Sequence, residues 1–269
     1  MSRKKDKQNR AVFIRWAVVL AAVLILVTAL AVYLKLSPAL QPQETAPTLP
    51  PNPYGPTDFA WEEDRLVCLS GRSIPGIDVS AHQGQIDWQA VRSSGVEFAF
   101  IRLGYRGYTS GTLHQDEYAL QNLQQAKAAG LQIGAYFFSQ ALSAGEARQE
   151  ARFALEILGD TPLDLPLVYD WEYVSEEMRT GHMAPQALVE CVHAFCGEVA
   201  RAGYEPMIYF NQELSKTLLD LTQVSEYPFW FAKYSDRMDF PYRIRFWQYS
   251  DTGSVPGIEG DVDLNLYFP

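Results

Sequence analysis

Short apolar runs rich in β-branched and aromatic residues recur along the chain and predict eight β-strands. The predicted strands span residues 76–80, 98–104, 132–139, 165–172, 206–211, 229–234, 245–250 and 263–267. Between the first six, apolar positions recur at helical spacing and predict five helices, at residues 88–94, 114–129, 143–158, 185–203 and 212–221. Strands that alternate with helices form a parallel sheet with right-handed crossovers. The sequence therefore predicts an α/β fold, an irregular TIM-like barrel of eight strands and five helices, (β/α)5β3, whose final third lacks helices.

Sequence signals mark two of the predicted helix ends. Ser143 and Glu146 have the spacing of a capping box, in which each side chain accepts a hydrogen bond from the backbone N–H of the other residue. Gly130 follows helix 114–129, where a glycine commonly ends a helix.

The N-terminal segment has the pattern of a membrane anchor. Six basic side chains against one acid occupy residues 1–15, and residues 16–34 carry no charge. As a helix, such a stretch spans a hydrocarbon core of about 30 Å, and the basic flank stays cytoplasmic. We expect a cytoplasmic segment at 1–15 and a single-pass cell-membrane anchor at 16–35, with the rest of the chain extracellular. A cleaved signal peptide is the alternative, although its apolar region is usually about 7–15 residues long.

The chain after the apolar stretch divides into a spacer and one domain. Residues 36–57 contain seven prolines and no apolar periodicity, which predicts an extended linker. Residues 58–269 are long enough for a single domain with a large core. Of the 22 basic and 32 acidic residues, seven and one precede residue 36, which leaves 15 and 31 and a net charge of −16. This charge argues against a nucleic acid or an anionic lipid surface as partner, and we expect a monomer.

The cysteines and histidines predict no metal or cofactor site. Cys191 and Cys196 lie about 140° apart around a helix and should not bridge each other. Outside the cell, Cys68 could pair with one of them, and three separate thiols are the alternative. No Cys or His spacing resembles a metal site, no cofactor is expected, and we assign no catalytic role to any of the four histidines.

Two carboxylates at the end of the fourth strand are the strongest candidates for chemistry. Asp170 and Glu172 are two residues apart, so in a strand they point to the same face about 7 Å apart, while Trp171 points away. Like charges this close raise each other's pKa. Such a pair can protonate a leaving oxygen and stabilise a cation, as glycoside cleavage requires. A solvated strand end is the structural alternative.

Further polar and aromatic residues fall near the carboxyl ends of the predicted strands, where barrel active sites lie. The polar ones are Asp78, Ser80, Asn211, Lys233 and Gln248, and the aromatic ones are Tyr136, Trp171, Tyr209, Trp230, Tyr234, Trp247 and Tyr249. Flat apolar rings beside carboxylates suit sugar faces. From these we predict substrate contacts by Tyr136, Tyr209, Trp230, Lys233 and Gln248.

These motifs, in this order, resemble the muramidase-type lysozymes of glycoside hydrolase family 25. The matching segments are GIDVSAHQGQIDW at 76–88, GAYFF at 134–138, DWE at 170–172, MIYFN at 207–211, WQY at 247–249 and VDLN at 262–265. The resemblance implies an irregular barrel of eight strands and five helices. It also implies hydrolysis of the β-1,4 bond between N-acetylmuramic acid and N-acetylglucosamine in peptidoglycan, here by a membrane-anchored member.

The resemblance also implies roles for four acids. Glu172 would be the proton donor, Asp170 would orient or stabilise, Asp78 would lie at the barrel floor, and Asp263 would complete the acidic cluster. Whether the mechanism is retaining, inverting or assisted by the substrate's acetamido group stays open, because side-chain rotamers decide the carboxyl separation. Two departures from the family pattern, at residues 103–107 and at Phe137, concern substrate detail.

Two rival functions remain. A non-catalytic module that binds wall glycan would keep the barrel as a recognition surface, but binding alone does not need clustered acids. A hydrolase of another N-acetylated polymer, such as chitin, would use the same acids.

Overall fold

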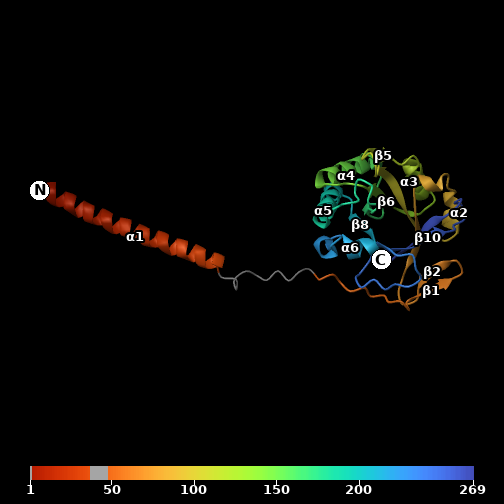
Figure 1. The fold of residues 1–269 in the computed structure, drawn as a ribbon, viewed down its shortest axis with the longest axis horizontal. Coiled ribbons are helices and arrows are strands. Elements are labelled where there is room, and N and C mark those ends of the chain that lie inside the picture. The colour runs from red at the N-terminus through yellow and green to blue at the C-terminus, as the bar shows by residue number, and fades with distance from the viewer. Residues whose placement is uncertain (1, 37–47) are drawn as a thin grey trace. The chain divides into compact units, whose positions relative to one another are not determined.

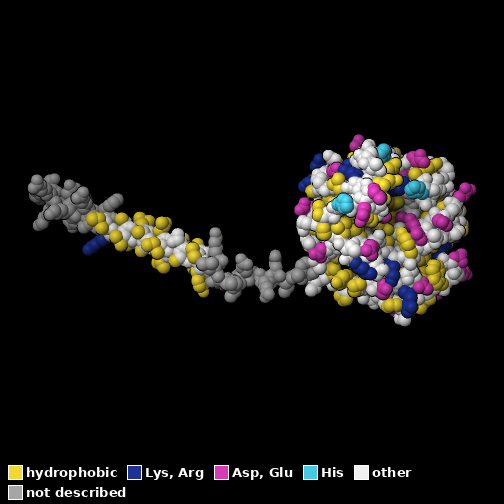
Figure 2. Space-filling view, viewed as in Figure 1, with side chains coloured by type: hydrophobic (Ala, Val, Ile, Leu, Met, Phe, Trp, Pro, Cys, Tyr) yellow, Lys and Arg dark blue, Asp and Glu magenta, His cyan; other side chains and the backbone are white. Residues whose placement is uncertain are grey.

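The computed structural model describes residues 2–36 and 48–269, which belong to two compact units, residues 1–46 and 47–269 (Figure 1). In the first unit, helix α1 runs over Ser2–Leu36. Its segment Ile14–Tyr33 has a mean hydropathy of 2.6, and its side chains are exposed and, apart from Arg15 and Thr28, apolar (Figure 2). This segment is long and apolar enough to cross a membrane, a test that a signal sequence also passes. Residues 37–47 of the predicted linker lie outside the described residues.

The second unit is built on a closed barrel of eight strands. They are β3 (Ile74–Val79), β4 (Phe98–Arg106), β6 (Gln132–Ser139), β7 (Leu167–Trp171), β8 (Pro206–Asn211), β9 (Phe229–Ala232), β10 (Phe246–Gly253) and β11 (Val262–Tyr267). Neighbouring strands from β3 round to β10 are parallel, and β11 closes the barrel by pairing antiparallel with both β10 and β3. The predicted barrel and its eight strands are confirmed.

Five helical connections cover the outside of this barrel (Figure 1). They are α2 (Trp88–Ser93), α3 (Ala119–Ala128), α4 (Ala144–Leu158), α5 (Pro185–Arg201), and α6 (Gln212–Thr217) followed by the short η3 (Leu221–Val224). The first part of the predicted helix 114–129 is instead the short strand β5 (Leu113–Gln115), which pairs antiparallel with the end of β4. Asp116 then accepts the N–H of Tyr118, and the helix begins only at Ala119.

The capping box predicted at the start of α4 is only half formed. Ser143 accepts the N–H of Glu146, as expected. The Glu146 carboxylate, however, accepts the N–H of Leu142 and binds the Arg179 guanidinium at 2.8 Å. The carboxylate therefore accepts the N–H of the residue before Ser143 and pairs with an arginine from the loop after β7, instead of accepting the Ser143 N–H.

Alternation along the strands separates two apolar layers. Phe98, Phe100, Val168, Met207 and Trp230 fill the barrel interior, and the intervening residues pack outward against the helices. The interior layer is tightly packed, because a Cβ atom added to Gly134 would lie only 2.3 Å from the ring of Phe100. Because inward-facing residues recur every second position, the last inward residue of each parallel strand, and the first of the antiparallel β11, reach the carboxyl end of the barrel.

The folded unit begins before the predicted boundary at Asp58. The N–H of Asn52 donates to Pro241 O at 2.9 Å, and that of Arg243 donates to Pro50 O at 2.8 Å. The ring of Tyr54 packs 4.8 Å from that of Phe268. An unpredicted hairpin, β1 (Phe59–Glu62) with β2 (Arg65–Cys68), follows directly. The last part of the predicted linker is thus packed on the barrel.

This docking predicts a cost for cutting the chain at Asp58. Compared with a chain that begins at Thr48, one that begins at Asp58 loses two backbone hydrogen bonds and an aromatic contact. Each contact contributes about 1 kcal/mol. In a domain of this size each kcal/mol lowers the melting temperature by about 2–4 °C, so we expect a fall of roughly 6–12 °C, as measured by circular dichroism. Equal melting temperatures would show that the docked segment adds nothing.

The thiols of all three cysteines are free. Cys191 and Cys196 are buried on α5, and burial raises the pKa of the Cys191 thiol to about 12, which makes it unreactive at neutral pH. Of the two alternatives left open by the sequence, the structure shows three separate thiols.

A buried ion pair joins the barrel to α4 and carries a stability prediction. Arg106 Nε lies 2.6 Å from Glu150 Oε1, both side chains are at most 5% exposed, and the Ser139 hydroxyl donates to Oε2 at 2.6 Å. Burial raises the pKa of Glu150 to about 7 even beside Arg106, so without the guanidinium this buried acid must take up a proton or stay unpaired. Arg106→Met also removes the hydrogen bonds to Gly111 O and Glu146 O, and it should lower the free energy of unfolding by about 3–5 kcal/mol in urea titrations. The matched control is Arg152→Met, whose pair with Glu198 is at the surface and should matter little. Equal losses in the two variants would contradict the prediction.

Candidate active site

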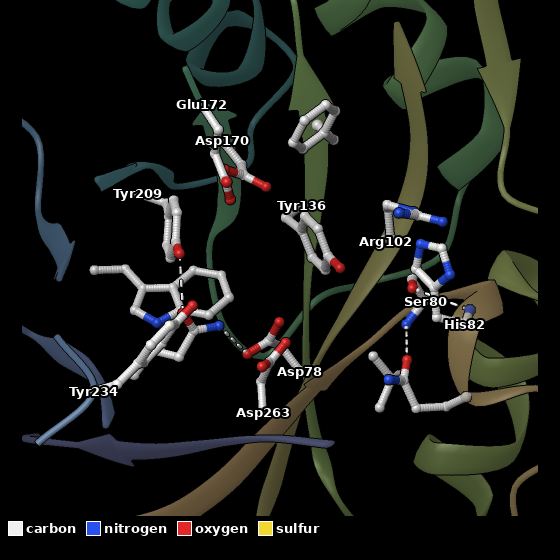
Figure 3. A pocket seen from close by; sticks show the side chains of 15 residues that line it. Asp78, Ser80, His82, Arg102, Tyr136, Asp170, Glu172, Tyr209, Tyr234 and Asp263 are labelled. Atoms are coloured by element: carbon white, nitrogen blue, oxygen red, sulfur yellow. Dashed lines mark hydrogen bonds between the residues drawn. The ribbon is translucent and has the colours of Figure 1, made fainter. Parts of the chain in front are cut away.

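A pocket of about 210 Å³ opens at the carboxyl ends of the barrel strands (Figure 3). Its walls come from nearly every strand of the barrel. The residues that line it are Asp78, Val79, Ser80, His82, Gln83, Arg102, Tyr136, Phe138, Asp170, Glu172, Tyr209, Trp230, Tyr234, Gln248 and Asp263. All four acids predicted as catalytic residues are among them.

The four acids form two carboxyl pairs. Asp170 and Glu172 leave the end of β7 on the same side, as the strand period predicts, and a hydrogen bond joins their carboxyl groups. Asp78 on β3 and Asp263 on β11 stand opposite each other in the antiparallel register, and their carboxyl groups are also hydrogen-bonded. Two acids in contact cannot both ionise easily, so each pair holds on to one proton.

Two amide side chains hold Asp78 in its ionised form. Gln248 Nε2 and Asn265 Nδ2 each donate to Asp78 Oδ2 at 2.8 Å. The orientation of both amides is fixed from behind, because Tyr209 O–H donates to the Gln248 oxygen and Trp230 Nε1–H donates to the Asn265 oxygen, both at 2.9 Å. Burial raises the pKa of Asp78, and these amide hydrogen bonds oppose that rise. Together with a hydrogen bond from Asp263, they favour the ionised form of Asp78.

Asp263 is the partner that holds the proton of this pair. Burial first, and then the charge of Asp78, raise the pKa of Asp263 to about 9. At neutral pH it is a neutral acid that donates to Asp78, so the pair carries a single negative charge at the barrel floor.

Burial also raises the pKa of both acids of the β7 pair. For Asp170, 5% exposed, the pKa lies well above its usual range through burial and then the charge of Glu172. For Glu172, burial raises the pKa most and the charge of Asp78 raises it further, while the hydrogen bond from Asp170 lowers it. The expectation that the two charges raise each other's pKa is confirmed for Asp170 and wrong for Glu172, on which Asp170 acts through this hydrogen bond. In the free pocket the shared proton lies with the more deeply buried Asp170.

One oxygen of this pair has no partner. Asp170 Oδ1 is buried and accepts no hydrogen bond within the described part of the chain. A buried carboxyl oxygen without a donor is costly, so this oxygen is available to a donor from water or from a ligand. Glu172 lies beside Asp170 in the pocket and is less buried than Asp170 (Figure 3).

The structure also places the predicted substrate contacts. Tyr136, Tyr209, Trp230 and Gln248 line the pocket. Lys233 does not line the pocket. Its ammonium group forms an ion pair with Asp239, with Nζ 2.5 Å from Oδ1. Its contact with substrate stays a prediction.

Several other residues near the strand ends face away from the pocket. Trp171, Trp247 and Tyr249 pack in the outer layer between the barrel and its coverings, and Asn211 caps α6 through Leu214 N–H. Strand periodicity explains why the two tryptophans point away from the pocket. Trp171 is next to Asp170 and Trp247 is next to Gln248, and neighbouring residues of a strand point to opposite faces.

The pocket also contains residues that were not predicted as part of the site, among them Arg102, Gln83, Phe138 and His82. Arg102 follows Phe98 and Phe100 at intervals of two on β4, which was a usable signal for an inward side chain. His82 lies in the short turn η2 (Ala81–Gln83), whose capping box between Ser80 and Gln83 turns the chain over the pocket rim. Among the described residues, no group of three or more His, Cys, Asp or Glu side chains is arranged to hold a metal ion.

Comparison with known proteins decides the family. Residues 77–258 match the model of glycosyl hydrolases family 25. The chain belongs to this family. It is 36% identical over 204 residues to the uncharacterized protein YegX of Escherichia coli O6:H1, covering 72% of this chain and 70% of that protein. It is 30% identical over 219 residues to lysozyme M1 of Streptomyces globisporus, covering 77% and 72%.

Solved structures share the barrel of this family 25 member. The bacterial lysozyme from Streptomyces coelicolor superposes with a TM-score of 0.61 at 29% identity, covering 74% of this chain and 93% of that one. The modular autolysin LytC of Streptococcus pneumoniae, solved with a synthetic peptidoglycan ligand, has a TM-score of 0.64 at 24% identity, covering 73% of this chain. This chain spans about half the length of LytC, at 47%. The predicted family and its barrel fold are confirmed.

Proposed function

We propose that this chain is a peptidoglycan muramidase that hydrolyses the β-1,4 bond between N-acetylmuramic acid and N-acetylglucosamine. The observation that carries the proposal is the presence of two proton-holding carboxyl pairs in one pocket of a family 25 barrel. The names of the relatives support the substrate class, since lysozyme M1 is a lysozyme and LytC was solved with a peptidoglycan ligand.

Glu172 acts as the general acid in this proposal. It is the more accessible acid of the β7 pair, so it can reach the glycosidic oxygen. The unpartnered Asp170 Oδ1 accepts the N–H of the substrate's acetamido group. This hydrogen bond favours ionised Asp170, and the shared proton moves to Glu172 on substrate binding.

Bond cleavage then follows from these positions. Glu172 donates its proton to the glycosidic oxygen, the C1–O bond breaks, and the acetamido oxygen, held by Asp170, attacks C1. The ionised Asp78 at the barrel floor stabilises the positive charge that develops on the sugar. Glu172, now a carboxylate, accepts a proton from the water that opens the cyclic intermediate, which restores the starting state.

Identification of the new reducing end tests the proposed function. The full chain in detergent is incubated with cell-wall fragments, and the products are reduced with borohydride and analysed by mass. We expect reduced muramic acid ends. Reduced glucosamine ends, or equal turnover of chitin, would favour the hydrolase of another polymer, and the absence of any product would favour a glycan-binding module.

We propose that α1 anchors the protein in the cell membrane, with residues 1–15 cytoplasmic and the barrel outside as a monomer on a Pro-rich spacer. The 20-residue apolar segment of α1 and its basic flank support this topology. The full chain should stay in the membrane fraction after carbonate extraction. A soluble form that begins near Leu40 would instead show that the helix is a cleaved signal.

A further inference from the structure

The pocket has a second lobe that the proposed chemistry does not use. In Figure 3, Ser80, His82 and Arg102 lie on the opposite side of Tyr136 from Asp170 and Glu172. Arg102 is the only Lys or Arg among the described residues that line the pocket. The other charged residues of the lining are the four acids. This lobe therefore provides a fixed cation in a pocket that is otherwise acidic.

Arg102 is held in place from its rear side. Its Nε donates to Asp116 Oδ2 at 2.8 Å, and Asp116 is only 1% exposed. Asp116 also accepts the N–H groups of Ala81 and Tyr118, so its position is fixed by the backbone. The guanidinium carbon lies 5.3 Å from the centre of the Tyr105 ring. These contacts orient the guanidinium. Only its Nε atom takes part in the ion pair with Asp116.

The two terminal nitrogens of Arg102 have no hydrogen-bond partner among the described residues. The side chain is 14% exposed and is part of the pocket lining. Two parallel N–H groups in a planar fork match the two oxygens of a carboxylate. The acidic side of the pocket repels such a group, so Arg102 is the place in the pocket where a carboxylate can bind.

The substrate of the proposed reaction carries a carboxylate on its muramic acid units. Muramic acid differs from glucosamine by a lactyl ether, whose carboxyl group is free or extended by a stem peptide with carboxylates of its own. We propose that Arg102 binds a carboxylate on this lactyl arm and so selects muramoyl glycan over chitin. This inference rests on the proposed function.

Matched substrates test the role of Arg102. One is a muramoyl oligosaccharide with a free lactyl carboxylate, the second is the same oligosaccharide as its methylamide, and the third carries the stem peptide. We expect wild-type protein to cleave the free acid with a higher kcat/KM than the methylamide. Arg102→Gln should reduce this ratio by about 10- to 100-fold, mainly through KM. Arg102→Lys should retain part of the preference, and the surface control Arg152→Gln should retain all of it.

The outcomes separate the inference from the proposed function. The inference would be overturned if Arg102→Gln left the ratio of kcat/KM for the free acid to that for the methylamide unchanged, including by lowering both values equally. Arg102 would then have only the structural role of pairing with Asp116. Dependence on Arg102 with the stem-peptide substrate alone would assign the bound carboxylate to the peptide. No muramic reducing end from any substrate with wild-type protein would overturn the proposed function and the inference with it.

A second measurement avoids substitution altogether, in case Arg102→Gln does not fold. The preference of wild-type protein for the free acid over the methylamide should weaken as salt rises, because ions screen the pair between guanidinium and carboxylate. A preference that salt does not change would contradict the proposal.

Discussion

Replacing Glu172 by glutamine should lower the rate of cell-wall hydrolysis by about 10²–10⁴-fold, with the fold intact. Glutamine preserves the size of the side chain and its hydrogen bonding but cannot donate a proton to the glycosidic oxygen at neutral pH. The measurement is the clearing of a wall suspension, with thermal unfolding of the variant as a check on its fold.

The matched control is Glu156→Gln on the exposed face of α4, which makes the same chemical change far from the pocket lining. It should clear the suspension as fast as the wild-type protein. Full activity of Glu172→Gln would remove Glu172 from the role of general acid.

Replacing Asp170 by asparagine should cause a comparable loss, about 10²-fold or more. In the proposed mechanism Asp170 Oδ1 accepts the acetamido N–H, and its negative charge stabilises the positive charge that develops on the acetamido group as its oxygen attacks C1. An asparagine oxygen can accept the N–H but carries no charge. Asparagine also cannot exchange a proton with Glu172. The loss should appear in kcat measured with a soluble muramoyl oligosaccharide. A loss much smaller than that of Glu172→Gln would limit Asp170 to tuning the pKa of Glu172.

The strand pattern predicted most of the barrel because parallel strands buried on both faces are continuous apolar runs. It failed where local pairing depends on distant partners. Strand β5 forms only because β4 offers its edge at Gly104–Arg106, and the segment at Pro50 and Asn52 is ordered only by residues 240–243. Neither partner is visible in the local sequence.

The site was predictable in part for the same physical reason. Side chains of a strand alternate between its two faces, which predicts that Asp170 and Glu172 lie on the same side. The same alternation along β4 predicts that Arg102 points inward. The pairing of Asp78 with Asp263 depends on the antiparallel closure of β11 on β3, which brings together residues far apart in the chain. Lys233 has the polarity of a binding residue, but the neighbouring Asp239 pairs with its ammonium group, a contact that strand periodicity does not predict.

The alkaline limb of the pH–rate profile tests most directly whether the β7 pair supplies the catalytic proton. Burial raises the pKa of both acids, so the pair keeps one proton at neutral pH, and activity is lost as the pH rises through the upper pKa of the pair. In Asp170→Asn only Glu172 titrates, without a second acid to share the proton, and its carboxylate accepts an amide N–H. Its pKa should therefore lie lower, and the limb should shift toward acid. A limb in the same place in wild-type protein and Asp170→Asn would contradict a shared proton on this strand.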